Sequence, residues 1–300
     1  MSKKINVPEP EKNLKFIDAH CHLPFPRPKN DKLPSDEEQY MNYFKKGGIY
    51  LITCSIDMIT LDLVLKFIKD KKNIGFTCGW APQTVTYTPK NKYKTEWKKW
   101  IDYILQNVER YLAIGEIGLD FHHAKTLKSR NKQIEELKKI LEITKDLGKH
   151  YVLHVRNAAQ NEFDRENPQH RFNKRDGANK EILRILKEIN INPKNVLWHC
   201  FSGPENYSRT LPNQGFMLSV PSSSYGFDRW QNVSKNAPLD SLVIETDAYY
   251  QHPFKRGPVN VPSNARYSIA AIAFSHNLPQ KIVSEKTIEN TKKFFDLKIE

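Results

Sequence analysis

Eight short apolar runs, separated by longer segments of helical periodicity, constrain the fold of this chain more than any other feature of its sequence. The runs cover residues 16–18, 50–55, 74–78, 112–117, 151–155, 196–200, 216–220 and 242–245. Each run is continuous and does not alternate between apolar and polar residues, which is typical of parallel strands buried on both faces.

The segments between these runs have the pattern of amphipathic helices. Trp97, Trp100, Ile101 and Ile104, for example, follow the spacing of a single helical face. A chain of 300 residues is long enough for one large barrel or two ordinary domains. Because strands and helices alternate throughout and no linker divides the chain, we expect one domain over residues 1–300, an α/β fold of the (β/α)8 TIM-barrel type.

Two segments fall outside this alternation. Residues 1–13 are polar and are expected to be flexible, and residues 157–178 form a polar insert containing Arg165, Arg171, Lys174 and Arg175. The insert follows a predicted strand, so we expect it to lie near the active-site face, to overhang the site and to add positive charge. No apolar run is long enough to span a membrane. No CxxC pair supports a zinc knuckle, and in a chain of this length the four cysteines are interpreted as reduced thiols of a cytoplasmic protein.

The net charge of +13 has two interpretations. A positive field attracts polyanions, which favours a partner that carries phosphate groups. The lysines are spread along the chain and do not cluster, however, so the charge can equally reflect composition alone.

Five of the predicted strands end in side chains that are suited to bind a metal ion. These side chains are His20, His22, Glu116, His154, His199 and Asp247. The carboxyl ends of parallel barrel strands meet around one mouth, which would bring these distant residues together. Because every other residue of a strand points to the same face, His20 and His22 can reach one ion.

The residue types predict a centre of two divalent ions. Glu116 has two oxygens and can bridge both ions, His154 and His199 would hold the second ion, and Asp247 would bind the first and contact the attacking water. Two ions about 3.5–4 Å apart activate water as a nucleophile at neutral pH. Histidine and carboxylate ligands suit zinc, manganese, nickel or magnesium, and the sequence does not decide among them.

The remaining histidines are interpreted as hydrogen-bonded core or surface residues, since a lone histidine at a strand end is seldom a ligand. They are His122, His123, His150, His170, His252 and His276. Cys21 and Cys200 stand next to predicted ligands but are interpreted as small buried thiols.

The chain resembles the TatD-related deoxyribonucleases, a branch of the metal-dependent amidohydrolase superfamily, along nearly its whole length and in the same order. The matching stretches are Asp18-Ala19-His20-Cys21-His22-Leu23, residues 115–121, Leu153-His154-Val155-Arg156, His199-Cys200-Phe201-Ser202-Gly203 and Glu245-Thr246-Asp247-Ala248, followed by residues 256–261 and 287–295.

The resemblance implies a metallo-dependent hydrolase barrel that cleaves phosphodiester bonds in DNA with divalent metal ions. It implies that Glu116 and Asp247 are catalytic, with Asp247 as general base. We expect an exonuclease that acts on single strands or frayed ends, because a barrel mouth admits one strand more readily than a duplex. No obligate protein partner is expected. Arg156 is the candidate phosphate contact, with a salt bridge to a nearby acid as the alternative.

The sequence departs from the family pattern at two places where substrate would bind. The family commonly has Gly-x-His-Pro after the third strand, whereas this chain has Gly79-Trp80-Ala81-Pro82, and its Asp-Ser-Pro-Tyr after the last ligand is here Asp247-Ala248-Tyr249-Tyr250. Trp80, Tyr249 and Tyr250 can either stack on bases or pack in the core.

These departures keep two other functions open. An amidohydrolase or esterase that cleaves a small amide, lactone or ester could use the same metal site. A binding module without catalysis is disfavoured, because every expected ligand is present.

Overall fold

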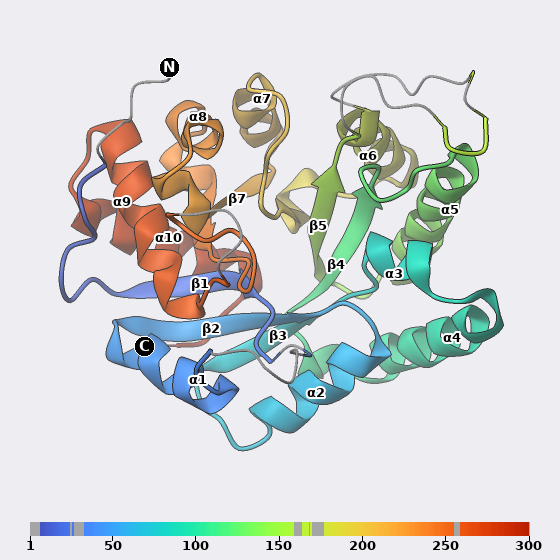
Figure 1. The fold of residues 1–300 in the computed structure, drawn as a ribbon, viewed down its shortest axis with the longest axis horizontal. Coiled ribbons are helices and arrows are strands. Elements are labelled where there is room, and N and C mark those ends of the chain that lie inside the picture. The colour runs from blue at the N-terminus through green and yellow to red at the C-terminus, as the bar shows by residue number, and fades with distance from the viewer. Residues whose placement is uncertain are drawn as a thin grey trace.

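The computed structural model describes residues 7–24, 26, 33–158, 164–167, 169, 177–254 and 259–299. Within these residues, eight parallel strands form one sheet in the order of the sequence (Figure 1). They are β1 (Phe16–Cys21), β2 (Gly48–Ser55), β3 (Ile74–Cys78), β4 (Ala113–Asp120), β5 (His150–Arg156), β6 (Val196–Trp198), β7 (Met217–Pro221) and β8 (Leu242–Glu245). Each of the predicted strands is present.

Helices alternate with the strands and cover the outside of the sheet (Figure 1). They are α1 (Asp36–Lys45), α2 (Met58–Ile68), α3 (Pro82–Tyr87), α4 (Lys90–Gln106), α5 (Leu127–Thr144), α6 (Gly177–Ile189), α7 (Tyr207–Gln214), α8 (Asp228–Asn236), α9 (Ala265–His276) and α10 (Gln280–Phe295). Short 3-10 turns add η1 (Val108–Arg110), η2 (Pro193–Asn195), η3 (Ser222–Tyr225), η4 (Leu239–Ser241) and η5 (Pro262–Asn264). The architecture is a (β/α)8 barrel, as predicted.

Hydrogen bonds beyond the strand ladders join the last strand to the first. Thr246 N donates to Asp18 Oδ1 at 2.9 Å, and Asp247 N donates to the His20 carbonyl at 3.0 Å. His22 N donates to the Ala248 carbonyl at 2.7 Å. This seam between β1 and the segment after β8 holds residues 18–22 and 246–248 side by side.

Apolar side chains fill the barrel at the end where the strands begin. Ile17, Ile52, Val152 and Val243 belong to one buried cluster with Phe294 and Phe295 of α10. His150, the first residue of β5, contacts the Phe294 ring at a centroid distance of 4.7 Å. Because α10 closes this end with apolar groups, polar side chains inside the barrel can gather only at the opposite end, where the strands finish.

Local sequence signals account for several helix boundaries. The Ser35 side chain accepts a hydrogen bond from Glu38 N, and the Glu38 side chain accepts one from Ser35 N, so α1 begins with a capping box. Trp100, Ile101 and Ile104 form the buried face of α4, as their spacing predicts. Helix α5 ends at Thr144 with Lys145 as its C-cap, and Gly148 lies in the short segment before β5 at φ +67°.

The two irregular segments are only partly described. Of the predicted flexible N-terminus, residues 1–6 lie outside the described part of the chain. Farther on, Glu11 N donates to Gln280 Oε1, and Tyr225 Oη donates to the Val7 carbonyl. Most of residues 159–176 also lies outside the described ranges, and with it the predicted overhang of the insert. Asn157 Oδ1 accepts from Ala178 N at 2.9 Å, which fixes the start of α6.

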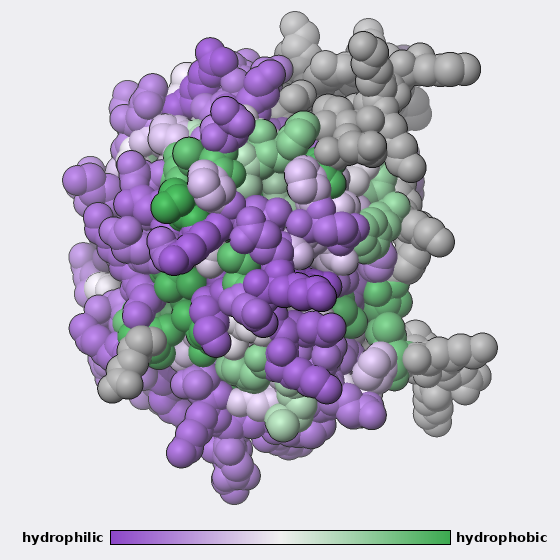
Figure 2. Space-filling view, turned by 90° about the vertical axis from the view of Figure 1, so that its left-hand side faces the viewer, coloured by the Kyte–Doolittle hydropathy of each residue, from purple (hydrophilic) through white to green (hydrophobic). Residues whose placement is uncertain are grey.

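Hydrophilic residues dominate the face that includes α9 (Figure 2), and hydrophobic side chains show between them as small separate patches. Among the described residues, no helix is long and apolar enough to cross a membrane.

Candidate metal centre

The structure brings all six predicted ligands together at the carboxyl ends of the strands. His20 lies on β1 and His22 just after it, Glu116 lies on β4, His154 on β5, His199 directly after β6 and Asp247 after β8. We call His20, His22, Glu116, His154, His199 and Asp247 the histidine–carboxylate cluster. Its side chains are buried, apart from that of His154, which is 16% exposed.

The first part of the cluster consists of two histidines facing two carboxylates. Nε2 of His22 lies 3.3 Å from Asp247 Oδ1 and 3.6 Å from Glu116 Oε2. Nε2 of His20 lies 3.8 Å from the same Asp247 oxygen and 3.6 Å from the same Glu116 oxygen. Four polar atoms from three different strands therefore converge on one small space.

The second part of the cluster consists of Glu116, His154 and His199. His154 Nδ1 lies 2.8 Å from Glu116 Oε1 and 3.2 Å from His199 Nε2. His199 Nε2 lies 3.8 Å from Glu116 Oε2. Because the potential ligand atoms of Glu116, His154 and His199 all lie within 4.8 Å of one another, this group can hold a metal ion.

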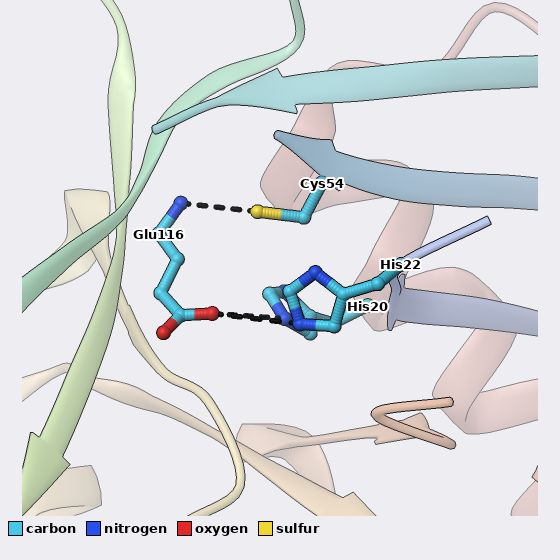
Figure 3. A group of neighbouring side chains, drawn as sticks. All are labelled: His20, His22, Cys54 and Glu116. Carbon is cyan, nitrogen blue, oxygen red and sulfur yellow. Dashed lines mark hydrogen bonds and ion pairs between the residues drawn. The ribbon is translucent and has the colours of Figure 1, made fainter. Parts of the chain in front are cut away.

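Cys54 of β2 also lies within this distance of His20, His22 and Glu116. Figure 3 shows its sulfur directed at the Glu116 backbone, while the Glu116 carboxylate turns toward the two histidines. Cys54 Sγ accepts a hydrogen bond from Glu116 N at 3.1 Å. We therefore interpret Cys54 as a group that positions the Glu116 backbone. The sequence analysis did not single it out.

The chemistry of the cluster fits a divalent metal. Among the described residues, both ring nitrogens of His20 are buried and have no hydrogen-bond partner. A buried polar atom without a partner costs free energy unless a bound group satisfies it. Imidazole nitrogens and carboxylate oxygens are common ligands of first-row divalent ions and magnesium.

The two carboxyl groups of the cluster are held in their charged form. Burial by itself raises the pKa of Glu116, but the positive charges of His154 and His199 outweigh burial and hold this pKa well below its usual range. Burial likewise raises the pKa of Asp247, and the hydrogen bond to His22 with the charge of His199 lowers it overall. Both groups are therefore anionic at neutral pH, as metal ligands must be.

The histidines respond to this environment in different ways. Burial lowers the pKa of His154, but Glu116 and Asp120 raise it to about 10 in the metal-free protein. Burial and the charge of His199 lower the pKa of His20. His154 thus carries a proton that a metal ion would have to displace, whereas His20 tends to be neutral.

Three carboxylates behind the cluster escaped the sequence analysis. Asp120 Oδ2 accepts from His154 Nε2 at 3.0 Å, and Glu245 Oε1 lies 3.7 Å from His199 Nδ1. Asp18 Oδ1 accepts from His20 N at 3.3 Å. A signal was present for two of them, since Asp18 and Glu245 each stand two residues before a predicted ligand, on the same side of an extended chain.

Two of the strand ends adopt an uncommon backbone conformation. Asp247 has φ +50° and Cys200 has φ +45°, both in the left-handed region that non-glycine residues seldom occupy. Residues held this way often cluster at functional sites. Here the conformation occurs at Asp247 and next to His199.

The predicted substrate contacts lie in different surroundings. Arg156 ends β5 with an exposed side chain, and in the described parts of the chain no acid forms an ion pair with it. Trp80 is 1% exposed and donates from Nε1 to Tyr93, so it packs in the core and does not offer a stacking surface. Tyr250 is 56% exposed, and its ring lies 6.2 Å from that of His22. Tyr249 donates to Asp36 at 2.8 Å.

Ala81, where the family commonly has histidine, is buried and offers no polar side chain. The polar group that this segment supplies is Gln83 of α3, whose Nε2 donates to Asp120 Oδ2 at 3.0 Å. His123 also contacts Asp120, so it is hydrogen-bonded as expected, and its partner is a residue that contacts the cluster.

Comparison with known proteins agrees with this geometry. Residues 17–296 match the family model described as TatD related DNase. The chain belongs to this family. The protein is therefore a metal-dependent hydrolase of the TatD family.

The relatives match nearly the whole chain. An uncharacterized metal-dependent hydrolase of Methanocaldococcus jannaschii is 25% identical over 286 residues, 95% of this chain and 98% of the relative. The human protein named deoxyribonuclease TATDN3 is 25% identical over 288 residues, 93% of this chain and 94% of its own.

Solved structures of TatD proteins share the fold. The Escherichia coli TatD homologue YjjV has a TM-score of 0.75 at 20% identity, covering 94% of this chain and 98% of its own. A TatD-family hydrolase of Entamoeba histolytica has a TM-score of 0.73 at 18% identity, covering 95% of this chain and 99% of its own.

Proposed function

We propose that this protein is a deoxyribonuclease that hydrolyses phosphodiester bonds with water activated by two divalent ions, and that it acts as an exonuclease on single strands or frayed ends. The observation that carries the proposal is the orientation of Glu116. One of its oxygens lies 2.8 Å from His154 Nδ1, and the other lies 3.6 Å from Nε2 of both His20 and His22. A carboxylate that faces two groups of nitrogen ligands is suited to bridge two ions.

We assign the ligands of the cluster to two ion positions. His20, His22, Glu116 and Asp247 would hold one ion, and Glu116, His154 and His199 the other. When bound, zinc, manganese, magnesium or nickel would stabilise negative charge on the phosphoryl oxygens and lower the pKa of water. The remaining tasks of binding, orientation and proton transfer fall to side chains of the protein.

Asp247 is placed to act as general base. Its Oδ1 is oriented by His22 Nε2 at 3.3 Å, and its backbone N is bonded to the His20 carbonyl at 3.0 Å. The carboxylate is ionised at neutral pH because His22 and His199 outweigh the effect of burial on its pKa. Asp247 can therefore accept the proton of the attacking water.

Arg156 would bind a phosphate group of the DNA substrate. It stands two residues after His154 on the same strand, so both leave the strand on the same side. The planar guanidinium can grip two phosphate oxygens at once. The net charge of +13 would draw an anionic strand toward the barrel mouth.

The decisive test is a time course on single-stranded DNA labelled at the 3′ or the 5′ end, with Mg2+, Mn2+ or EDTA. Wild type is compared with Glu116→Gln, which keeps the side-chain volume but removes the charge. Glu136→Gln is the matched control, because Glu136 is 5% exposed and lies on α5 outside the cluster. We expect stepwise, metal-dependent shortening by wild type and by the control, and none by Glu116→Gln.

The label that is released first gives the polarity of cleavage. Internal cuts without stepwise shortening would contradict the exonuclease part of the proposal. Absence of cleavage with every metal, together with metal-dependent turnover of a small ester or amide, would replace the nuclease by an amidohydrolase or esterase on the same cluster.

A further inference from the structure

Three side chains, those of Asp120, Gln83 and His123, form a hydrogen-bonded network next to Nε2 of His154. Asp120 Oδ2 accepts from His154 Nε2 at 3.0 Å, from Gln83 Nε2 at 3.0 Å, and from the ring of His123 through Nδ1 at 2.8 Å. Asp120 is fully buried, while the His123 side chain is 34% exposed. The network thus extends from the cluster to the surface.

We propose that Asp120 is a positioning residue, which fixes the tautomer and ring plane of His154 so that Nδ1 faces the second metal position. Gln83 and His123 hold the Asp120 carboxylate in place for this purpose. The inference rests on the proposed two-ion function and assigns residues to it that carry no metal themselves.

The direction of the hydrogen bond decides the tautomer. An ionised carboxylate can only accept, so the ring proton of His154 belongs on Nε2, the atom next to Asp120. The other nitrogen, Nδ1, faces Glu116 Oε1 and His199 Nε2 at 2.8 and 3.2 Å, and it would be the atom that binds an ion once its own proton is lost. A histidine fixed in this way is the ordinary arrangement behind a metal ligand.

The surroundings of Asp120 leave its side chain little freedom to turn away. His123 N donates to Oδ1 at 2.9 Å, so both carboxylate oxygens are engaged. The Asp120 backbone N donates to Gln133 Oε1 at 2.9 Å, and Gln133 in turn donates to the Pro82 carbonyl at 3.1 Å. Through these two hydrogen bonds, Gln133 of α5 connects β4 with the start of α3.

Gln83 brings the segment after β3 into the network. Its Nε2 lies 3.4 Å from His154 Nε2, so both groups converge on the same oxygen of Asp120. The neighbouring Ala81 contributes no polar side chain, although this is where the family commonly has histidine. The segment after β3 therefore reaches His154 indirectly, through Gln83 and Asp120.

The second histidine of this metal position lacks an equally tight partner. Glu245 Oε1 lies 3.7 Å from His199 Nδ1, beyond hydrogen-bond distance, and its other oxygen accepts from Ser219 Oγ at 2.6 Å. The contact of Asp120 with His154, at 3.0 Å, is therefore shorter than the contact of Glu245 with His199.

The test compares wild type with Asp120→Ala and Asp120→Asn, stripped of metal and titrated with Zn2+ by native mass spectrometry and calorimetry. We expect wild type to bind two ions. Asp120→Ala should keep one at wild-type affinity and bind the other about 10- to 100-fold more weakly. Asp120→Asn should lose less zinc affinity, because its amide oxygen can still accept the hydrogen bond from His154. It also replaces Asp120→Ala in the test if the alanine variant does not fold.

A spectroscopic measurement separates positioning from a general loss of structure. In zinc-loaded protein with 15N-labelled histidine, the His154 ring signals, assigned by their absence in His154→Gln, should show a protonated Nε2. Asp120→Ala should shift them. Asp57→Ala is the control, because Asp57 caps α2 by accepting from Thr60 N at 2.8 Å and its loss destabilises the fold without touching the network.

The possible failures are distinguishable. If wild type binds a single ion, the two-ion function fails, and the inference is then judged on that ion. Equal zinc affinities in wild type and Asp120→Ala, with unchanged His154 ring signals, would overturn the role of Asp120 whatever the number of ions.

Discussion

Thr246 donates two hydrogen bonds to the carboxylate of Asp18, from its backbone N to Oδ1 at 2.9 Å and from Oγ1 to Oδ2. Asp18 lies on β1 and Thr246 follows β8, so this pair joins the two ends of the sheet. Burial raises the pKa of Asp18 well above its ordinary value, and the bonds from Thr246 counteract that effect. The pair also stands next to His20 and Asp247, whose side chains depend on the same seam.

Replacing Thr246 by valine should lower the free energy of unfolding by about 1–3 kcal/mol, because a buried acceptor on Asp18 loses its partner. Thr291→Val is the matched control, since Thr291 is equally buried but its hydroxyl donates only within α10, to the Thr287 carbonyl at 2.7 Å. Chemical denaturation measures both. Equal losses in the two variants would show that the seam has no special importance.

Metal binding should raise the melting temperature of the wild-type protein by several degrees. An ion that binds only the folded chain adds about 2.7 kcal/mol when its concentration is 100 times its dissociation constant. Calorimetry with and without EDTA measures the shift, which Glu116→Gln should largely remove. A shift of wild-type size in Glu116→Gln would indicate that the ion binds outside the cluster.

Metal affinity should fall as the pH is lowered, because His154 has a pKa of about 10 in the metal-free protein and must lose its proton to bind. Each proton released makes the apparent dissociation constant about tenfold larger per pH unit. Calorimetry at pH 8 in buffers of different ionisation enthalpy counts the protons. His154→Gln should release fewer than wild type, and equal counts would contradict the expectation.

The same shifts set the pH dependence of the metal-free protein. The raised pKa of His154 adds stability that is complete below its ordinary value of 6.5 and is lost as the pH rises through about 10. The lowered pKa of Glu116 adds stability that is present above 4.5 and is lost as the pH falls. The contribution of His154 and Glu116 to stability should therefore be largest between pH 4.5 and pH 6.5. Melting curves of His154→Gln should lack the loss of stability at alkaline pH.

Arg156→Ala should raise the Michaelis constant for single-stranded DNA and reduce the slope of log affinity against log salt by about 1, as expected for the loss of one phosphate contact. Arg156→Lys should keep the salt dependence but lose the two-pronged grip. Arg110→Ala is the control, because Arg110 is exposed just before β4, at the other end of the barrel. A salt slope unchanged by Arg156→Ala would exclude the contact.

Tyr250→Ala should weaken binding of single-stranded DNA by about 1–3 kcal/mol if the exposed ring stacks on a base, whereas Tyr250→Phe should bind normally. Phe274 on α9 is 45% exposed and provides the control substitution Phe274→Ala. Fluorescence anisotropy with a labelled oligonucleotide measures all three. Unchanged binding by Tyr250→Ala would show that the ring is not part of the binding surface.

The strands and the predicted ligands could be read from the sequence because each depends on a short, regular signal. Buried parallel strands are continuous apolar runs, and a polar residue that interrupts such a run at its end, as His154 does after Leu153, is conspicuous. The geometry of the barrel then brings these residues together. Their role as ligands remains a prediction.

The supporting residues could not be read in the same way. Asp120, Gln83 and Cys54 act through hydrogen bonds whose existence depends on side-chain rotamers and on the distance between separate elements. The same residue types occur throughout the chain without any such contact. The positive φ of Asp247 has no sequence signal either, since a non-glycine residue adopts it only when its surroundings impose it.

The distribution of the cluster along the chain has a consequence for biosynthesis. His20 belongs to the first strand and Asp247 follows the last, and the hydrogen bond from Asp247 N to the His20 carbonyl joins them. A ribosome therefore has to translate all eight strands and the segment up to Asp247 before the proposed first ion position is complete. Until then the growing chain lacks the full set of ligands, so capture of metal at this position has to follow synthesis of the barrel.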